Sequence, residues 1–207
     1  KERTQSTTIQ TILGLRKVAK NPNFSSLLLV GAFISAPFMA YLALASYIYI
    51  DGFGVSETTF SMYFASNAAA SILGPVMYMR FGAGSVKKVI NVGIFVAIIS
   101  AILILTVGNA SPIIFLLSYV IYSIITSYFR PLISDLLLSA TKTDVGAASS
   151  VMNFGFTVIG SIGMVVGSLQ WSSYTGGLGI TMLIFIALTT IVWFYLLKAR
   201  SIQFNWK

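Results

Sequence analysis

The chain contains no cysteine and no histidine among its 207 residues. Without cysteine it has no disulfide framework, no thiol nucleophile and no sulfur ligand for a metal. Without histidine it lacks the side chain that usually changes charge near neutral pH. The sequence also shows no zinc-ligand spacing, nucleotide-binding loop, nucleophile elbow or carboxylate pair. We therefore expect neither an enzyme nor a metal protein, and no bound cofactor.

Charge is scarce and hydrophobic residues are abundant. Only 9% of the residues are charged and 57% are hydrophobic, whereas a soluble domain carries about 25% charged residues. The apolar runs are continuous and reach the roughly 20 residues that a helix needs to cross a bilayer. A membrane barrel would instead alternate apolar and polar residues. The composition therefore predicts an all-α membrane protein.

Six spans are predicted, with a polar arm before them and a short basic tail after them. The spans cover about 25–50, 58–79, 89–107, 112–135, 145–169 and 178–197. The arm comprises residues 1–24, and we expect either a short amphipathic helix on the membrane surface or a partly ordered linker there. The tail comprises residues 198–207. Because the chain begins at Lys1 and not at methionine, we expect it to be part of a longer, processed or engineered protein.

The basic residues predict the orientation. Twelve of the thirteen fall in the arm, the second loop, the fourth loop and the tail, and the other three loops contain none. They are Lys1, Arg3, Arg16, Lys17, Lys20, Arg80, Lys87, Lys88, Lys142, Lys198, Arg200 and Lys207. The positive-inside rule then places both termini in the cytoplasm of a multi-pass cell-membrane protein. The net charge of +8 is spread over short segments that contact lipid headgroups, which argues against nucleic acid as a partner.

The spans differ in character. The third and sixth are almost entirely aliphatic, whereas the others carry aromatic residues, amides, hydroxyls and glycines. Polar groups within a bilayer face protein or water, so the third helix of each triplet is expected to face lipid. An odd number of spans per triplet makes the second unit inverted relative to the first. Two inverted three-helix repeats around a central site are typical of transporters.

Four stripes of aromatic and weakly polar residues suggest a substrate cavity. Face to face, spans one, two, four and five would enclose a nearly uncharged space that suits large apolar or cationic molecules. The alternative is ordinary helix packing, with interhelical hydrogen bonds from the two asparagines. The candidate substrate-binding residues are Phe38, Tyr41, Asn67, Tyr122, Thr126, Asn153 and Phe156.

Two ionisable residues lie in or near the fourth span. Arg130 is roughly 27 Å along it from Pro112, near the inner edge of a hydrocarbon core about 30 Å thick. We expect either a gating or substrate role for Arg130 and a coupling role for Asp135, or simple anchoring of both at the inner mouth. Elsewhere, Gly163 and Gly167 form a small-xxx-small pair that predicts close helix packing.

The order of these features resembles the C-terminal six-helix half of a major facilitator superfamily transporter. It is most similar to the drug:proton antiporters of the bicyclomycin/chloramphenicol-resistance branch. The similarity lies in Lys20–Phe24 (KNPNF), Tyr49–Ser56 (YIDGFGVS) followed by Phe60 and Asn67, Arg130–Ser134 (RPLIS) and Val145–Ser150 (VGAASS). The resemblance implies that spans one, two, four and five line the path and that the other two support it. Two positions depart from the family: Met79 stands where an Asp is usual, and Arg130 where a small residue is common.

The resemblance implies half of a secondary active transporter that exports hydrophobic or cationic small molecules by alternating access. A proton gradient would drive it, and the chain would need an N-terminal six-helix half or a second copy of itself. The alternatives are a metabolite transporter of the same superfamily and a non-transporting membrane scaffold.

Overall fold

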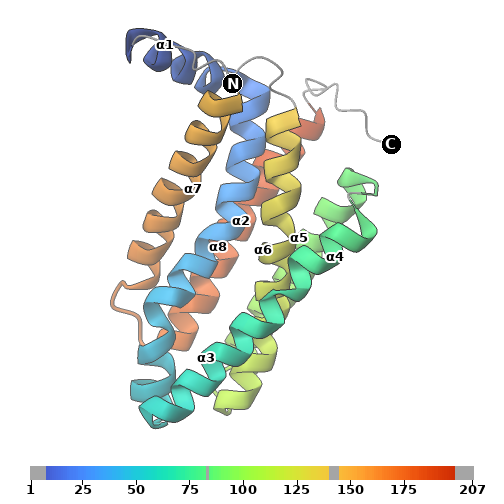
Figure 1. Cartoon of the computed structure of the whole chain (residues 1–207). Helices are drawn as coiled ribbons and strands as arrows, with labels where there is room; N and C mark the ends of the chain where they lie inside the picture. The colour runs from blue at the N-terminus through green and yellow to red at the C-terminus, as the bar shows by residue number, and fades with distance from the viewer. Residues whose placement is uncertain (1–7, 83, 140–144, 199–207) are drawn as a thin grey trace.

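The structure, a computed structural model, describes residues 8–82, 84–139 and 145–198, and within them every element is a helix (Figure 1). The helices are α1 (Thr8–Ala19), α2 (Pro22–Ser46), the π-helix η1 (Tyr47–Gly52), α3 (Glu57–Ser71), α4 (Leu73–Phe81), α5 (Val86–Val107), α6 (Pro112–Ser139), α7 (Val145–Gly167) and α8 (Tyr174–Lys198). The predicted tail beyond Lys198 and the basic residues Lys1, Arg3, Lys142, Arg200 and Lys207 lie outside the described residues.

Side chains cap the N-termini of α2 and α3. Asn21 precedes α2, and its Oδ1 accepts hydrogen bonds from the backbone N–H groups of Asn23 and Phe24, at 3.1 and 3.4 Å. Pro22 follows at the first helical position, where the missing N–H costs nothing. Ser56 caps α3 in the same manner, accepting from the N–H of Thr59 at 3.2 Å. In the predicted arm, the backbone of Thr8–Ala19 is helical.

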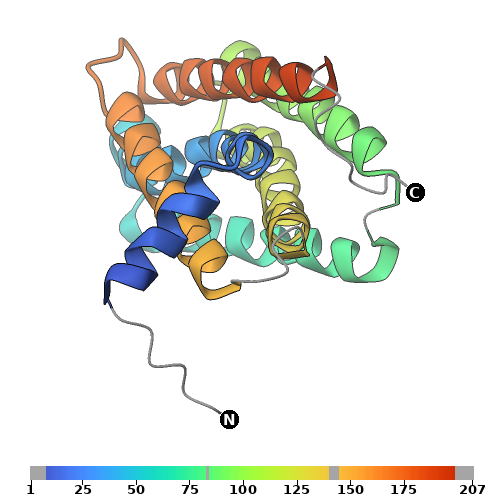
Figure 2. The same ribbon diagram turned by 90° about the horizontal axis from the view of Figure 1, so that it is seen from above.

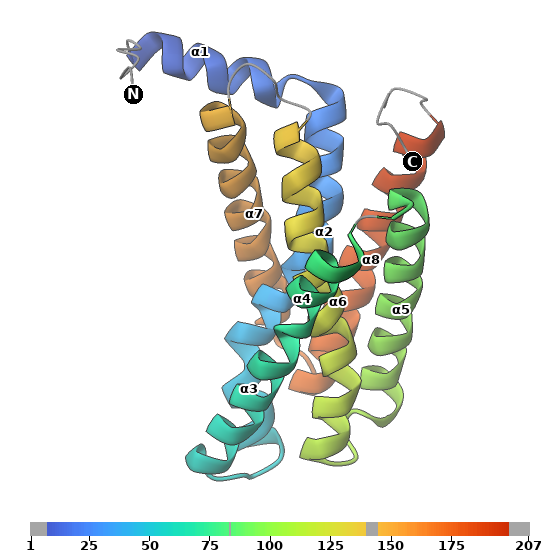
Figure 3. The same ribbon diagram turned by 45° about the vertical axis from the view of Figure 1, so that its right-hand side comes forward.

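Five of the helical segments are long and apolar enough to cross a membrane: Pro22–Gly52 (α2 with η1), α5, α6, α7 and α8. The chain is thus an all-helical protein whose long helices suit a bilayer. The second predicted span, 58–79, differs from the prediction, because it consists of two shorter helices of 15 and 9 residues. Figure 3 shows that α3 and α4 follow one another along the bundle.

Pro75 explains the break between α3 and α4. Proline has no N–H, so the carbonyl of Ser71 loses the hydrogen bond that residue 75 would donate in a regular helix. At the break, the N–H of Ile72 bonds to the carbonyl of Ala69, three residues earlier and not four, at 3.3 Å. Pro37 and Pro131 lie within α2 and α6, which continue through them. Of these three prolines, only Pro75 coincides with a break between two helices, and it lies in the least apolar of the predicted spans.

The helices of the two predicted triplets are interleaved. α2 packs most extensively on α7 and α8, whereas α6 packs on α5, α4 and α3. α2 also contacts α6, and α5 contacts α8. Figure 2 shows α2 and α6 between α5 and α8 on one side and α3, α4 and α7 on the others. The first helix of each triplet thus packs on the second and third helices of the other triplet.

Two glycines allow another helix's backbone to approach closely. A Cβ added at Gly163 of α7 would lie 2.5 Å from the carbonyl oxygen of Ala36 in α2. A Cβ added at Gly74 of α4 would lie 2.5 Å from the carbonyl oxygen of Ile124 in α6. Gly167 also faces α2, at Ala40. The predicted role of the small-xxx-small pair in close packing is therefore confirmed.

Most of the basic residues in the described part of the chain gather at one end of the bundle. This end holds the end of α1, the α1–α2 connection, the adjoining ends of α4 and α5, and the end of α8 (Figure 1). The basic residues of these segments are Arg16, Lys17, Lys20, Arg80, Lys87, Lys88 and Lys198. We call this the basic end; Asp51 and Glu57 lie at the opposite end. α5 and α8 expose large apolar side chains, namely Val92, Phe95, Ile99, Ile102 and Leu105 on α5 and Ile180, Ile184, Leu188, Ile191, Phe194 and Tyr195 on α8.

Single cysteines will report how often the chain crosses the membrane, because the natural sequence has none. Asp51→Cys and Asn109→Cys should react in intact cells with a maleimide that cannot cross membranes. Lys20→Cys and Lys87→Cys should react only after the membrane is opened. If Asp51→Cys and Lys87→Cys react from the same side, α3 and α4 do not cross and the six-span prediction fails.

Gly163→Ala should destabilise the bundle even though alanine favours helix formation by about 1 kcal/mol. The added methyl group meets a backbone carbonyl that cannot move aside, and overpacking costs about 1–3 kcal/mol. The free energy of unfolding, from a reversible detergent titration, should fall by about 1 kcal/mol. Ser161→Ala, on the exposed face of the same helix, is the control and should change it by less than about 0.5 kcal/mol. Equal effects of the two variants would contradict the packing described here.

Candidate functional site

A cluster of aromatic rings fills the interior between α2 with η1, α3 and α6, towards the end opposite the basic one. The rings of Tyr41 and Tyr119 are stacked with centroids 4.0 Å apart, and those of Tyr49 and Tyr63 with centroids 5.1 Å apart. Such contacts are favourable beyond the burial of apolar area. The members of this aromatic cluster are Tyr41, Tyr49, Phe53, Phe60, Tyr63, Phe64, Phe115, Tyr119 and Tyr122.

The aromatic cluster differs from the cavity that the sequence predicts. Tyr41, Tyr119 and Tyr122 are each 0% exposed, so their rings offer no free surface to a ligand in this structure. Three of the four predicted stripes do meet, but they pack ring on ring and do not line open space. The helical spacing that places rings on one face is the same for a packed core and for a cavity wall, so the sequence could not separate the two.

Some polar atoms within this interior have a hydrogen-bond partner and others have none in the described part of the chain. The Tyr122 hydroxyl donates a 2.7 Å hydrogen bond to the carbonyl of Ile34, three residues before Pro37 in α2. By contrast, the hydroxyls of Tyr119 and Ser123 and the Oδ1 atom of Asn67 are buried without a hydrogen-bond partner in the described part of the chain. Leaving such a group unpaired costs about 1–3 kcal/mol. These three atoms could therefore accept or donate to water or to a ligand.

The two candidate asparagines lie apart. Asn67 on α3 is 3% exposed, whereas Asn153 on α7 is exposed. α3 packs on α6 and α7 packs mainly on α2, and α3 and α7 share no substantial contact. The structure therefore does not bring Asn67 and Asn153 to one site within this chain.

Four other predicted residues do come together, around a small groove between α2 and α6. It has a volume of about 90 Å³ and is lined by Ser35, Phe38, Met39, Thr126, Ser127 and Arg130. The guanidinium carbon of Arg130 lies 5.5 Å from the centre of the Phe156 ring on α7, a distance that allows cation–π attraction. We call this site the Arg130 groove. It joins Phe38, Thr126, Arg130 and Phe156 from three helices.

Asp135 belongs to a different contact. Its Oδ2 atom accepts a 2.9 Å hydrogen bond from the hydroxyl of Tyr78 on α4. The Tyr78 ring in turn meets the ring of Tyr128 edge-on, with centroids 5.7 Å apart. The two ionisable residues of α6 thus have separate partners: Asp135 ties α6 to α4, and Arg130 faces α7.

The Arg130 groove has a simple chemical character. It combines one positive charge, three hydroxyl groups and an aromatic ring, and none of its lining residues carries a carboxylate. The hydroxyls of Ser35 and Thr126 donate to backbone carbonyls of their own helices, which leaves the guanidinium as the main free donor. Over the described ranges, no group of three or more His, Cys, Asp or Glu residues could hold a metal ion. The groove can therefore bind a small acceptor group but carries no nucleophile with its base.

The sequence matches no protein-family model, and no curated protein matches it. The resemblance to the major facilitator superfamily stays a prediction from the motifs.

Two conservative substitutions in the aromatic cluster should affect stability differently. Tyr122→Phe removes the bond to Ile34 and should lower the free energy of unfolding by about 0.6–1 kcal/mol. Tyr119→Phe removes a hydroxyl without a described partner and should leave stability unchanged or raise it. A detergent titration of each purified variant gives the comparison. If Tyr119→Phe destabilises as much as Tyr122→Phe, that hydroxyl has a partner, such as a bound water.

Proposed function

We propose that this chain is one six-helix half of a secondary transporter for small molecules, in which α3 and α4 together form the second of six spans. The observation that carries the proposal is the exposed amide on α7. Asn153 is exposed there, one helical turn from Phe156, which contacts Arg130. An amide facing lipid is expensive, so such a face requires protein or water against it.

The covering element would be a second six-helix unit. α7 is the least apolar and the least buried of the five long apolar helices. Its exposed face carries Ser150, Thr157 and Ser161 among apolar residues such as Phe154 and Val165. On the other side, the exposed residues of α5 from Val92 to Leu105 and of α8 from Ile180 to Tyr195 are apolar, as in helices against lipid. An N-terminal half of the same transporter, or a second copy of this chain, would pack against the exposed face of α7. A water-accessible path would then lie between the two units.

The mirrored contacts support an inverted repeat. In the first triplet, Gly74 lies beside Pro75 and touches a carbonyl of the fourth span. In the second triplet, Gly163 touches the carbonyl of Ala36, which lies beside Pro37 of the first span. Each contact joins the second helix of one triplet to the first helix of the other. Inverted repeats of this kind rock about a central site in alternating-access transporters.

The substrate class follows from the surfaces that meet at the path. Phe38 in the groove and Phe156 beside Arg130 favour molecules with an aromatic or apolar body. Export of hydrophobic or cationic molecules, driven by a proton gradient with both termini in the cytoplasm, is the form of this function that the resemblance implies.

A second candidate is the transport of organic anions, including metabolites. Arg130 favours it, because a guanidinium binds carboxylates through paired hydrogen bonds and repels cations. No carboxylate lines the Arg130 groove to offset that charge. The packed aromatic cluster favours the third possibility, a membrane scaffold that transports nothing.

A transport assay in proteoliposomes tests these alternatives. It compares the chain alone, the chain with a matching N-terminal half, and that pair carrying Asn67→Ala and Asn153→Ala, all under an imposed proton gradient. The probes are a naphthylmethyl trimethylammonium ion and 2-naphthoate, which share an aromatic body and differ in charge. Transport should require both halves and should fall at least tenfold in the double variant. Ser61→Ala, exposed on α3, is the matched control and should not affect it.

The preferred probe and its response to Arg130→Gln identify the substrate class. Preference for the ammonium ion, increased by Arg130→Gln, supports the cation exporter. Preference for naphthoate, lost in Arg130→Gln but retained in Arg130→Lys, supports the anion transporter. If neither probe moves although both halves insert and assemble, the proposed transport of aromatic ions is wrong and the scaffold is favoured.

A further inference from the structure

An apolar groove opens between α4, α5 and α6 near the basic end. Its volume is about 540 Å³. α4 and α5 follow one another in the chain and both pack on α6, but they make almost no contact with each other. The groove is the space that they leave, and α6 forms its floor. It is separate from the Arg130 groove, with which it shares no lining residue.

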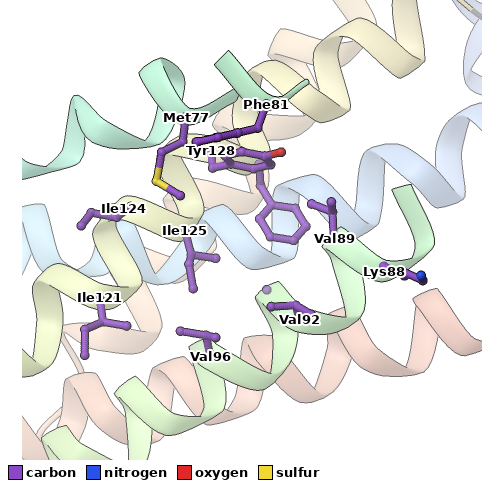
Figure 4. Close-up of a pocket in the computed structure, with 12 residues that line it drawn as sticks. Met77, Phe81, Lys88, Val89, Val92, Val96, Ile121, Ile124, Ile125 and Tyr128 are labelled. Carbon is purple, nitrogen blue, oxygen red and sulfur yellow. The ribbon is translucent and has the colours of Figure 1, made fainter. Parts of the chain in front are cut away.

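The walls are aliphatic and aromatic. α5 contributes Val92 and Val96, and α6 contributes a row of isoleucines ending at Tyr128 (Figure 4). The Tyr128 hydroxyl donates to the carbonyl of Gly82 at 2.7 Å, so it presents no free polar group. At the floor, the ring of Phe129 rests where a Cβ on residue 93 would lie, and glycine at that position keeps α5 close to α6. The interior of the groove is therefore suited to hydrocarbon.

One end of the groove is positively charged. Figure 4 shows Lys88 at one end of the lining and Val96 and Ile121 at the other. Lys88 is exposed and belongs to the same turn region as Arg80 and Lys87, and residues 58–134 contain no Asp or Glu. The one carboxylate further along α6, Asp135, accepts from Tyr78 and does not line the groove. No carboxylate among the lining residues therefore neutralises the positive charge of Lys88.

The dimensions agree with one leaflet of a bilayer. Lys88, Val92 and Val96 are spaced by four residues and lie along one face of α5, over roughly 12 Å. One leaflet contributes about 15 Å to the hydrocarbon core. A chain entering from the headgroup level beside Lys88 would therefore lie in the groove along most of its depth in that leaflet.

We infer that the groove between α4, α5 and α6 binds an anionic phospholipid of the surrounding bilayer. One acyl chain lies against Val92, Val96 and the isoleucines of α6, and the phosphate lies at Lys88. Charge complementarity selects this occupant, because basic pockets between membrane helices bind anionic headgroups, at about 1 kcal/mol per basic residue. The apolar walls alone would accept any lipid, and Lys88 with its neighbours supplies the preference for negative charge. This inference does not rest on the proposed transport function.

Retention of lipid by the purified protein tests the site. The chain is placed in nanodiscs of equimolar phosphatidylglycerol and phosphatidylcholine with identical acyl chains, and the lipids that stay bound after release into detergent are counted by mass spectrometry. The expected result is one retained phosphatidylglycerol in preference to phosphatidylcholine. Lys88→Gln should reduce that preference about fivefold. Lys198→Gln, which removes an exposed lysine at the same end but outside the groove, should leave it unchanged.

A second pair of variants tests the acyl-chain position independently of charge. Val96→Phe fills the groove and should reduce the retention of both lipids, whereas Val165→Phe, on the exposed face of α7, should not. Equal retention of the two lipids by the natural chain would overturn the inference, because the headgroup charge would then not matter. An equal effect of Lys88→Gln and Lys198→Gln, or unchanged retention in Val96→Phe, would also overturn it.

Discussion

Close backbone contact between helices is the constraint on which the rest of this structure depends. In a bilayer, an apolar side chain gains little by leaving lipid for another helix, so tight packing must hold the helices together. Here α7 meets α2 at Gly163 and α4 meets α6 at Gly74, in each case against a backbone carbonyl. These two contacts set the first helix of each triplet against the other triplet. The central positions of α2 and α6 follow from them, as do the positions of the residues that face outward.

The two sides of the bundle have different physical requirements. The side of α5 and α8 exposes valine, isoleucine, leucine and phenylalanine, which lipid accepts without cost. The side of α7 exposes Asn153 and several hydroxyl groups. The hydroxyls of Thr157 and Ser161 donate to carbonyls of their own helix. An amide has two N–H donors and an acceptor oxygen, which the backbone of one helix cannot all pair. The proposed partner unit and the proposed lipid therefore occupy different surfaces. The first mixes polar and apolar residues, and the second is apolar with a charged end.

The helices were largely predictable and the site only partly. The prediction of a third span over 89–107 corresponds to α5 (Val86–Val107), because a long aliphatic run leaves no alternative to a helix. The second span was predicted as one helix, and the effect of Pro75 divided it. Arg130 and Phe156 were named separately and lie together, since α6 and α7 cross at that level. Tyr119 and Ser123 were not named as candidates, although their buried hydroxyls lack a described partner; only the neighbouring helices make that visible.

The amino-acid sequence by itself determined that the chain is helical, with several helices long and apolar enough to cross a membrane. Backbone groups in hydrocarbon must be bonded within their own segment, so long apolar runs are helical wherever they lie, and the positions of lysine and arginine group the loops by side. Only the tertiary structure decided which faces are covered. Helical spacing places Tyr41 and Asn153 each on a face of its helix, but whether another ring, lipid or open space lies opposite depends on the neighbouring helix. That choice is made by the glycine contacts, which are local in space and distant in the chain.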